Sequence, residues 1–167
     1  IINGVFAMDS SETLTESLLA ELALPSGHAH RILVGGLGLG YTVAAISAHN
    51  VDAIDVVEIE PCLIDWSRHG ITTTLRAAAS DPRIRLHAGD IRHVLEGVND
   101  GPVGPWDAIV LDVDNGPDFL IFDENRELYT DAGLGAAYDQ LAPGGSLAIW
   151  CQRPAPPLLA TLHRIAP

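Results

Sequence analysis

The stretch RILVGGLGLGYTVAAI, residues 31–46, decides the fold that this chain is expected to adopt. Residues 31–35 are typical of a buried β-strand, and residues 41–49 have helical spacing. The turn that joins them contains four glycines, Gly35, Gly36, Gly38 and Gly40. Glycines are needed where a chain turns sharply and a ligand lies against bare backbone, while the helix N-terminus beyond the turn offers free N–H groups and positive potential. A nucleotide-like ligand in this turn accounts for all of these features together.

The rest of the chain alternates short β-branched runs with longer segments of helical spacing, which predicts βαβ units and a parallel sheet. The expected strands are residues 31–35, 53–59, 84–88, 107–112 and 146–151. The expected helices are residues 13–24, 41–49, 61–68, 91–95, 134–141 and 156–165. The Pro-Gly-Gly of residues 143–145 is expected to close the helix at 134–141 before its strand begins. The predicted fold class is α/β, a Rossmann-like doubly wound and mostly parallel sheet.

A single domain is expected over residues 1–167, because this length and a hydrophobic content of 47% suit one core. Within it, residues 1–24 are expected to form a strand end and a covering helix, residues 31–151 the sheet core, and residues 156–165 a C-terminal helix. The chain starts abruptly inside a strand-like run and stops just after a helical one. A truncation at either end therefore stays open.

The charge balance excludes some classes of partner. The net charge is -13, with nine Lys and Arg against 22 Asp and Glu, so nucleic acid and anionic membranes would be repelled. A cationic or neutral partner suits this charge, although an acidic surface that serves solubility explains it as well. Cys62 and Cys151 lie in apolar segments, like buried core residues in a reduced compartment. A cytoplasmic protein is expected, and the seven histidines show no paired metal spacing.

Three acids close successive predicted strands. Glu58 ends the second strand about twenty residues after the glycine turn, where an acid can accept both ribose hydroxyls of an adenosine group. Asp90, after Gly89, ends the third strand, where a carboxylate can take the exocyclic amine of adenine, and Asp112 ends the fourth. Open α/β sheets bind ligands at this edge. Each acid also has a structural reading as a helix cap or a solvated turn residue, and for Asp90 capping is a serious rival.

NAD is the competing ligand, because it uses the same turn and the same ribose acid. From Gly36 the chain reads GLGLGY, so the third glycine comes two residues after the second, whereas in the dinucleotide fingerprint it comes three residues after. The turn therefore lacks the glycine spacing that binds the pyrophosphate of a dinucleotide.

Several motifs together resemble spermidine synthases and their relatives, a group with the class I methyltransferase fold. They are GGLGLG after a strand, VVEIE, DPRIRLHAGD, WDAIVLDVDNGP, ENRELYTDAGL and LAPGGSLAIW. The resemblance runs from about residue 3 to residue 151, and NGVFAMDSSETLTESLL is similar to the segment that leads from the family's N-terminal hairpin into its first helix.

The resemblance implies a ligand and roles for the strand-end acids. The ligand would be S-adenosylmethionine or its decarboxylated form, without a metal. Glu58 matches the ribose-binding acid, Asp90 the adenine-binding acid, and Asp112 the acid that takes a proton from the attacking amine. The glycine turn would hold the amino-acid end of the ligand, and the neighbours Ile59, Gly89 and Ile91 would line its site. A homodimer is expected by analogy only.

The departures from the family fall in the half of the site that would bind a polyamine. Gly38 stands where the family has an aspartate that holds the amine end of the decarboxylated donor. The second acid of the polyamine site falls on Asn115, although Asp114 and Asp118 are near. Ala7 and Glu16 stand where the family has a glutamine and a tyrosine. The nucleoside half is therefore retained, and the polyamine half is largely missing.

Three functions stay open. The first is methyl transfer from S-adenosylmethionine to a small acceptor, with Asp112 orienting or deprotonating the nucleophile. The second is aminopropyl transfer to a cationic amine, in a channel rebuilt from Asp114, Asp118 and Glu16. The third is a non-catalytic binding or assembly module that kept the fold. Tyr129 follows the expected active-site loop and is a candidate to line an acceptor pocket, with packing as its alternative.

Overall fold

A computed structural model describes residues 14–24, 29–98 and 101–166. Its centre is a five-stranded sheet in the order β3-β2-β1-β4-β5, in which every neighbouring pair is parallel. The strands are β1 (Ala29–Gly35), β2 (Val51–Glu58), β3 (Ile84–Ala88), β4 (Trp106–Leu111) and β5 (Leu141–Ile149). The parallel α/β sheet predicted from the sequence is confirmed.

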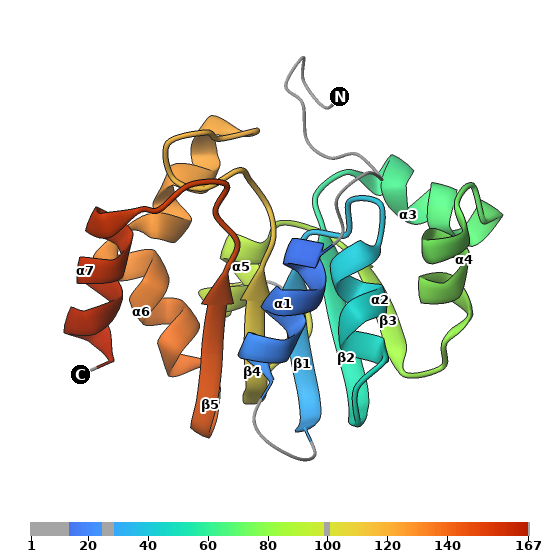
Figure 1. Cartoon of the computed structure of the whole chain (residues 1–167), viewed down its shortest axis with the longest axis horizontal. Helices are drawn as coiled ribbons and strands as arrows, with labels where there is room; N and C mark the ends of the chain where they lie inside the picture. Colours follow the sequence, from blue (N-terminus) through green and yellow to red (C-terminus); the bar gives the residue numbers. More distant parts are fainter. Residues whose placement is uncertain (1–13, 25–28, 99–100, 167) are drawn as a thin grey trace.

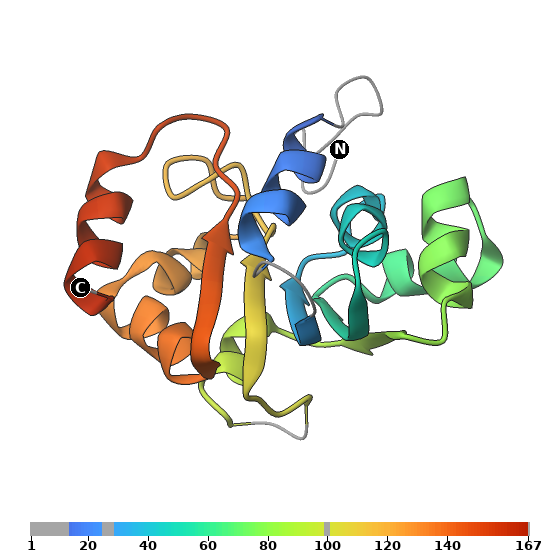
Figure 2. The same cartoon turned by 60° about the horizontal axis from the view of Figure 1, so that its bottom comes forward.

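Helices connect the strands and lie on both faces of the sheet (Figures 1 and 2). They are α1 (Leu14–Ala23), α2 (Tyr41–Ser47), α3 (Pro61–His69), α4 (Thr73–Ser80), α5 (Ile91–Leu95), the 3-10 helix η1 (Asp123–Tyr129), α6 (Asp131–Asp139) and α7 (Pro156–Ile165). Among the described residues, no helix is long and apolar enough to cross a membrane.

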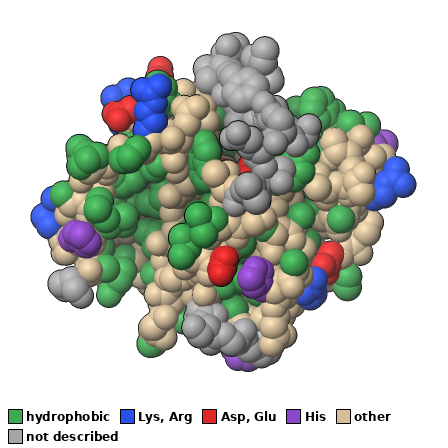
Figure 3. Space-filling model, viewed as in Figure 1, with side chains coloured by type: hydrophobic (Ala, Val, Ile, Leu, Met, Phe, Trp, Pro, Cys, Tyr) green, Lys and Arg blue, Asp and Glu red, His purple; other side chains and the backbone are tan. Residues whose placement is uncertain are grey.

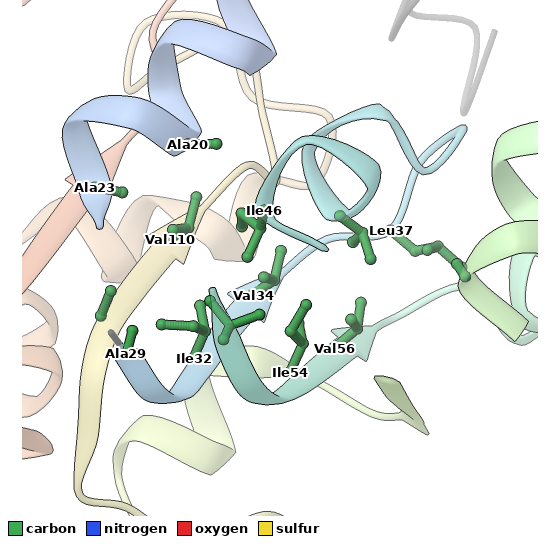
Figure 4. Packing of buried hydrophobic residues seen from close by; sticks show 14 of the residues in the cluster. Ala20, Ala23, Ala29, Ile32, Val34, Leu37, Ile46, Ile54, Val56 and Val110 are labelled. Carbon is green, nitrogen blue, oxygen red and sulfur yellow. The ribbon is translucent and has the colours of Figure 1, made fainter. Parts of the chain in front are cut away.

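Two apolar cores hold these layers together, because alternate residues of each strand point to opposite faces of the sheet. On one face, Ile32 and Val34 of β1 and Ile54 of β2 pack beneath α1 and α2, as Figure 4 shows. On the other face, Leu33 and its neighbours pack against α5, η1 and α6. The central strands are buried on both sides, which is why they read as nearly continuous apolar runs.

The strand order changes direction between β1 and β4. From β1 the chain adds β2 and β3 toward one edge of the sheet, and β4 and β5 then extend it toward the other edge. Gly36 lies at this point with a φ of 93°, and a Cβ there would come within 2.2 Å of the Asp112 carbonyl oxygen. Only glycine allows the two chain segments to approach so closely in this conformation. The loops after β1 and β4 therefore diverge from a common crevice, the usual ligand position in open α/β sheets.

The last strand begins earlier than the sequence predicted. β5 starts at Leu141, so the Pro-Gly-Gly of residues 143–145 lies inside it and does not end the preceding helix, which stops at Asp139. The pairing register between β4 and β5 shifts at this segment, where Gly144 has a φ of 79°. Proline is tolerated because β5 lies at the edge of the sheet.

Other expectations also need correction. Helix α4 and the 3-10 helix η1 were not among the expected elements. Cys62 is exposed and Cys151 is half-buried, so neither is the buried core residue that its apolar neighbours indicated. Cys62 lies in the first turn of α3, while Cys151 follows β5. Beside Cys151, the end of β5 and helix α7 border a shallow depression, and hydrophobic side chains gather on this side of the surface (Figure 3).

Candidate functional site

The loops that follow the five strands surround a cavity of about 600 Å³, which α1 also borders. Ten of the residues predicted from the sequence line this cavity: Glu16, Gly36, Gly38, Glu58, Ile59, Gly89, Asp90, Ile91, Asp112 and Asp114. The fold thus brings together side chains that lie nearly one hundred positions apart in the chain, as far as Glu16 is from Asp114.

Two of the four glycines in the turn do not line the cavity. A Cβ on Gly35 would come within 2.9 Å of the Ile91 side chain, so this glycine allows α5 to pack against β1. Gly40 has a φ of 84° and precedes α2 as its N-cap. Their part in the site is therefore to shape the turn, whereas Gly36 and Gly38 lie in the cavity wall.

Glu58 is buried and fastens the glycine turn from the end of β2. Its Oε2 accepts hydrogen bonds from the backbone N–H groups of Leu37 (2.7 Å) and Gly38 (3.4 Å), and its Oε1 accepts one from Glu60 (2.8 Å). A carboxylate has about four acceptor sites, so Glu58 keeps capacity for ligand hydroxyls. The carboxylate both shapes the turn and faces the cavity.

Asp90 has the capping role that competed with ligand binding in the sequence analysis. It is the N-cap of α5, where its Oδ1 accepts a hydrogen bond from the Arg92 backbone N–H, and it forms an ion pair of 2.6 Å with the Arg92 guanidinium. Burial raises the pKa of Asp90, but these bonds from Arg92 outweigh it and hold the pKa below its ordinary value. A contact with adenine remains a prediction.

Asp112 differs from Asp90, because no arginine or histidine of the described segments pairs with it. The hydroxyl of Thr42 donates a hydrogen bond of 2.5 Å to its Oδ2. Burial raises the pKa of Asp112 to about 6, with a further upward push from the negative charge of Glu16, against the opposing effect of the Thr42 hydrogen bond. Asp112 can therefore gain or lose a proton near neutral pH.

Two further carboxylates, Glu16 and Asp114, are buried and line the same cavity as Asp112. Glu16, in the first turn of α1, accepts a hydrogen bond of 2.8 Å from the Thr15 hydroxyl. Asp114 accepts hydrogen bonds from the Ile121 backbone N–H (2.7 Å) and from the Tyr129 hydroxyl (3.1 Å). Asp114 thereby ties the loop after β4 to the end of η1.

Tyr129 and Asp118 do not lie where the sequence analysis expected them, since neither lines the cavity. Tyr129 donates a hydrogen bond from its hydroxyl to Asp114. Its burial, together with the charge of Asp114, raises the pKa of this hydroxyl well above the ordinary range. Asp118 is exposed, because the turn that joins Gly116 to Phe119 carries it outward. A part for Asp118 in a rebuilt channel stays a prediction.

The sequence analysis missed several residues of the site. Thr42 touches Asp112, while Asn125, Trp150 and Gln152 line the cavity from η1 and from the loop after β5. The position of Thr42 in the first turn of α2, beyond the glycine turn, was the one signal that could have found it. Ala7 and the other residues of 1–13 lie outside the described residues.

Comparisons with known proteins agree with this geometry. A family model described as spermine/spermidine synthase domain matches residues 12–154. The chain is similar to spermine synthase of Arabidopsis thaliana, with 32% identity over 67% of this chain and 31% of the relative. It is also similar to polyamine aminopropyltransferase 2 of Streptomyces coelicolor, with 30% identity over 84% of this chain and 24% of the relative.

Among solved structures, spermidine synthase in complex with the transition state analogue AdoDATO superposes with a TM-score of 0.67. The identity is 18%, and the match covers 93% of this chain and 50% of that chain, so this likeness is one of fold. The chain spans between about a quarter and a half of the length of the curated relatives it matches.

Proposed function

Because the chain belongs to the spermine/spermidine synthase family, we propose that it transfers an aminopropyl group from decarboxylated S-adenosylmethionine to a small cationic amine. One observation carries this proposal. Six carboxylate side chains line the cavity, and no lysine, arginine or histidine is among the lining residues that the structure describes. The six are Glu16, Glu58, Glu60, Asp90, Asp112 and Asp114. Such a wall favours a ligand that carries positive charge itself.

The nucleoside part of the donor fits the wall on the side of β2 and β3. An added Cβ at Gly89 would meet no heavy atom within 4 Å, so open space faces the backbone where adenine is expected. Glu58 would accept hydrogen bonds from the ribose hydroxyls with the acceptor sites that the glycine turn leaves free. Gly38, in the cavity wall, would leave room for the chain of atoms beyond the ribose.

The charge of the wall also separates aminopropyl from methyl transfer. S-adenosylmethionine carries a carboxylate on its tail, which would enter a cavity whose lining holds six acids and no basic side chain among the described residues. The decarboxylated donor lacks that carboxylate and keeps only cationic groups. The relatives' names point the same way, so both considerations favour the second function of the sequence analysis over methyl transfer, which stood first.

The proposed transfer is a substitution at the carbon next to the sulfonium, with Asp112 as the proton acceptor. The lone pair of the acceptor nitrogen attacks the carbon next to the sulfonium, the C–S bond breaks, and its electron pair returns to sulfur to leave a neutral thioether. The nitrogen gives up one proton, for which Asp112 is the acceptor. Its pKa of about 6 leaves Asp112 largely ionised at pH 7 to 8, as a base must be. Glu16 and Asp114, which line the same cavity, would hold other ammonium groups of the acceptor.

An incubation with decarboxylated S-adenosylmethionine and putrescine at pH 8, followed by mass spectrometry of the amines, tests the proposal. We expect a product longer by one aminopropyl group. Asp112→Asn should keep donor binding in calorimetry while kcat falls by about 10²–10⁴-fold, the usual contribution of a general base. Asp139→Asn, an exposed acid at the end of α6, is the matched control and should match the wild type.

Two outcomes would overturn the proposal. Tighter binding of S-adenosylmethionine than of its decarboxylated form, together with a methylated acceptor, would restore the methyl-transfer function. Donor binding without any product, across diamines and polyamines of different length, would assign the chain to the non-catalytic binding modules.

A further inference from the structure

Thr42 contacts the proposed base from a helix that the sequence analysis assigned only to the glycine turn. It is the second residue of α2 and is 3% exposed. Its hydroxyl donates to Oδ2 of Asp112 at 2.5 Å, across seventy positions of sequence. The bond spans the crevice between β1 and β4, because α2 follows β1 and Asp112 follows β4.

The other groups that face Asp112 are acidic or weakly acidic. Glu16 on α1 acts on it through its charge, Tyr129 at the end of η1 is coupled to it electrostatically, and Asp114 and Cys151 lie in the same cavity wall. Thr42 is the side chain that the structure shows donating a hydrogen bond to this carboxylate within the described segments. A single hydroxyl therefore sets the orientation of Asp112 and opposes its protonation.

We propose that Thr42 is a positioning residue for the transfer, whose hydroxyl holds Oδ2 of Asp112 and leaves Oδ1 to take the proton from the acceptor nitrogen. This inference rests on the proposed function, since it assigns to Asp112 the part of base. Thr42 acts through Asp112 and needs no contact with either substrate.

The electrostatics of the site support this assignment. Burial and the charge of Glu16 raise the pKa of Asp112, and the hydrogen bond from Thr42 is the contribution that lowers it. Without that bond, the pKa of Asp112 should rise beyond about 6, so that a smaller fraction is ionised in weakly acidic solution. The consequence is confined to pH values near and below the pKa.

The test uses Thr42→Val, which keeps the shape of the side chain and removes the hydroxyl, and Thr42→Ser, which restores a hydroxyl. The titration of Asp112 is followed by NMR of ¹³C-carboxyl-labelled aspartate, with Asp112→Asn to assign the signal. The pH dependence of kcat and the KM of the donor are measured in parallel. Thr161→Val, at a buried threonine of α7 remote from the cavity lining, is the matched control.

For Thr42→Val we expect the Asp112 titration to move up by about one pH unit. The rate should then fall roughly five- to tenfold below pH 6 and come closest to the wild type above pH 8, with donor KM unchanged, because the ionised fraction of the base recovers at high pH. Thr42→Ser should restore most of the titration and the rate, and Thr161→Val should alter neither. If Thr42→Val does not fold, Thr42→Ala removes the same hydroxyl without a new methyl contact.

Unchanged titration of Asp112 in both hydroxyl-free variants would overturn the inference. A shifted titration with an unshifted rate profile would overturn it as well, because Thr42 would then have only a structural part. The NMR titration is independent of turnover. A wild type without product would therefore refute the proposed function, while the Asp112 signal would still report whether Thr42 controls the carboxylate.

Discussion

Asp55 and Asp112 are both carboxylates on the central strands or directly after them, and their surroundings are opposite. Asp55, in β2, is 1% exposed and is paired with the side chains of Arg31, Arg85 and His87, whose nitrogens lie between 2.9 and 3.2 Å from its oxygens. We call these four residues the Asp55 cluster. Asp112 has one hydroxyl partner and a neighbouring acid.

The two sites differ in whether cationic side chains of the described residues compensate the buried negative charge. Burial raises the pKa of Asp55, but the bonds from His87 and the two arginines outweigh it, so the pKa lies below its ordinary value. Burial raises the pKa of Asp112 to about 6, since no cation of the described segments opposes it. A half-buried acid without a cationic partner among the described residues is costly, and under the proposed function the ligand supplies the missing charge.

The largest effect on stability is expected when Asp55, the shared acid of the Asp55 cluster, is replaced. Asp55→Asn should lower the free energy of unfolding by about 3 kcal/mol, because it leaves three donors without their common anion. The figure is at the low end for a broken buried pair, since the partners can reach water. Urea denaturation at pH 7 measures it. A loss below 1 kcal/mol would mean that the cluster is a surface network, and the contrast with Asp112 would fail.

The same substitution at Asp112 should raise the free energy of unfolding rather than lower it. The folded pKa of about 6 lies above the ordinary 3.8, so wild-type stability should fall as the pH rises from about 4 to 6, with the full penalty above that range. Asp112→Asn removes this penalty and should raise the free energy of unfolding at pH 8 by about 2 kcal/mol. Urea midpoints between pH 4 and 8 test this. A less stable variant at pH 8 would show that the acid is compensated within the protein.

The smallest effect on stability should come from removing one partner of Asp55 while both arginines stay in place. His87→Gln removes one hydrogen bond to Asp55, and both arginines remain, so the loss should be about 1 kcal/mol or less. Because the pKa of Asp55 is lowered in the folded protein, the stability that the cluster provides is lost only as the pH falls below about 4. Thermal melts at pH 7 and pH 3 compare the variant with wild type. A loss as large as that of Asp55→Asn would make His87 the main partner.

Residues whose role follows from a strand end were predicted from the sequence, and residues placed by loops were not. Glu58 is the last residue of β2, Asp112 directly follows β4, and Asp90 comes two residues after β3, so parallel pairing brings them to one edge. Asp118 and Tyr129 follow a loop whose path depends on the bonds of Asp114, and no periodic pattern encodes that path.

The sequence by itself determined the α/β class, the parallel strands and the acids that close them, because apolar runs and glycine turns act locally and repeat along the chain. Only the tertiary structure decided which acids are compensated. Arg92 neutralises Asp90, and Arg31 and Arg85 neutralise Asp55. Glu16, Asp112 and Asp114 line one cavity without a basic side chain among its described lining residues. The physical reason is that Coulomb interactions depend on distance in space and on burial, and neither is written in the local order of residues.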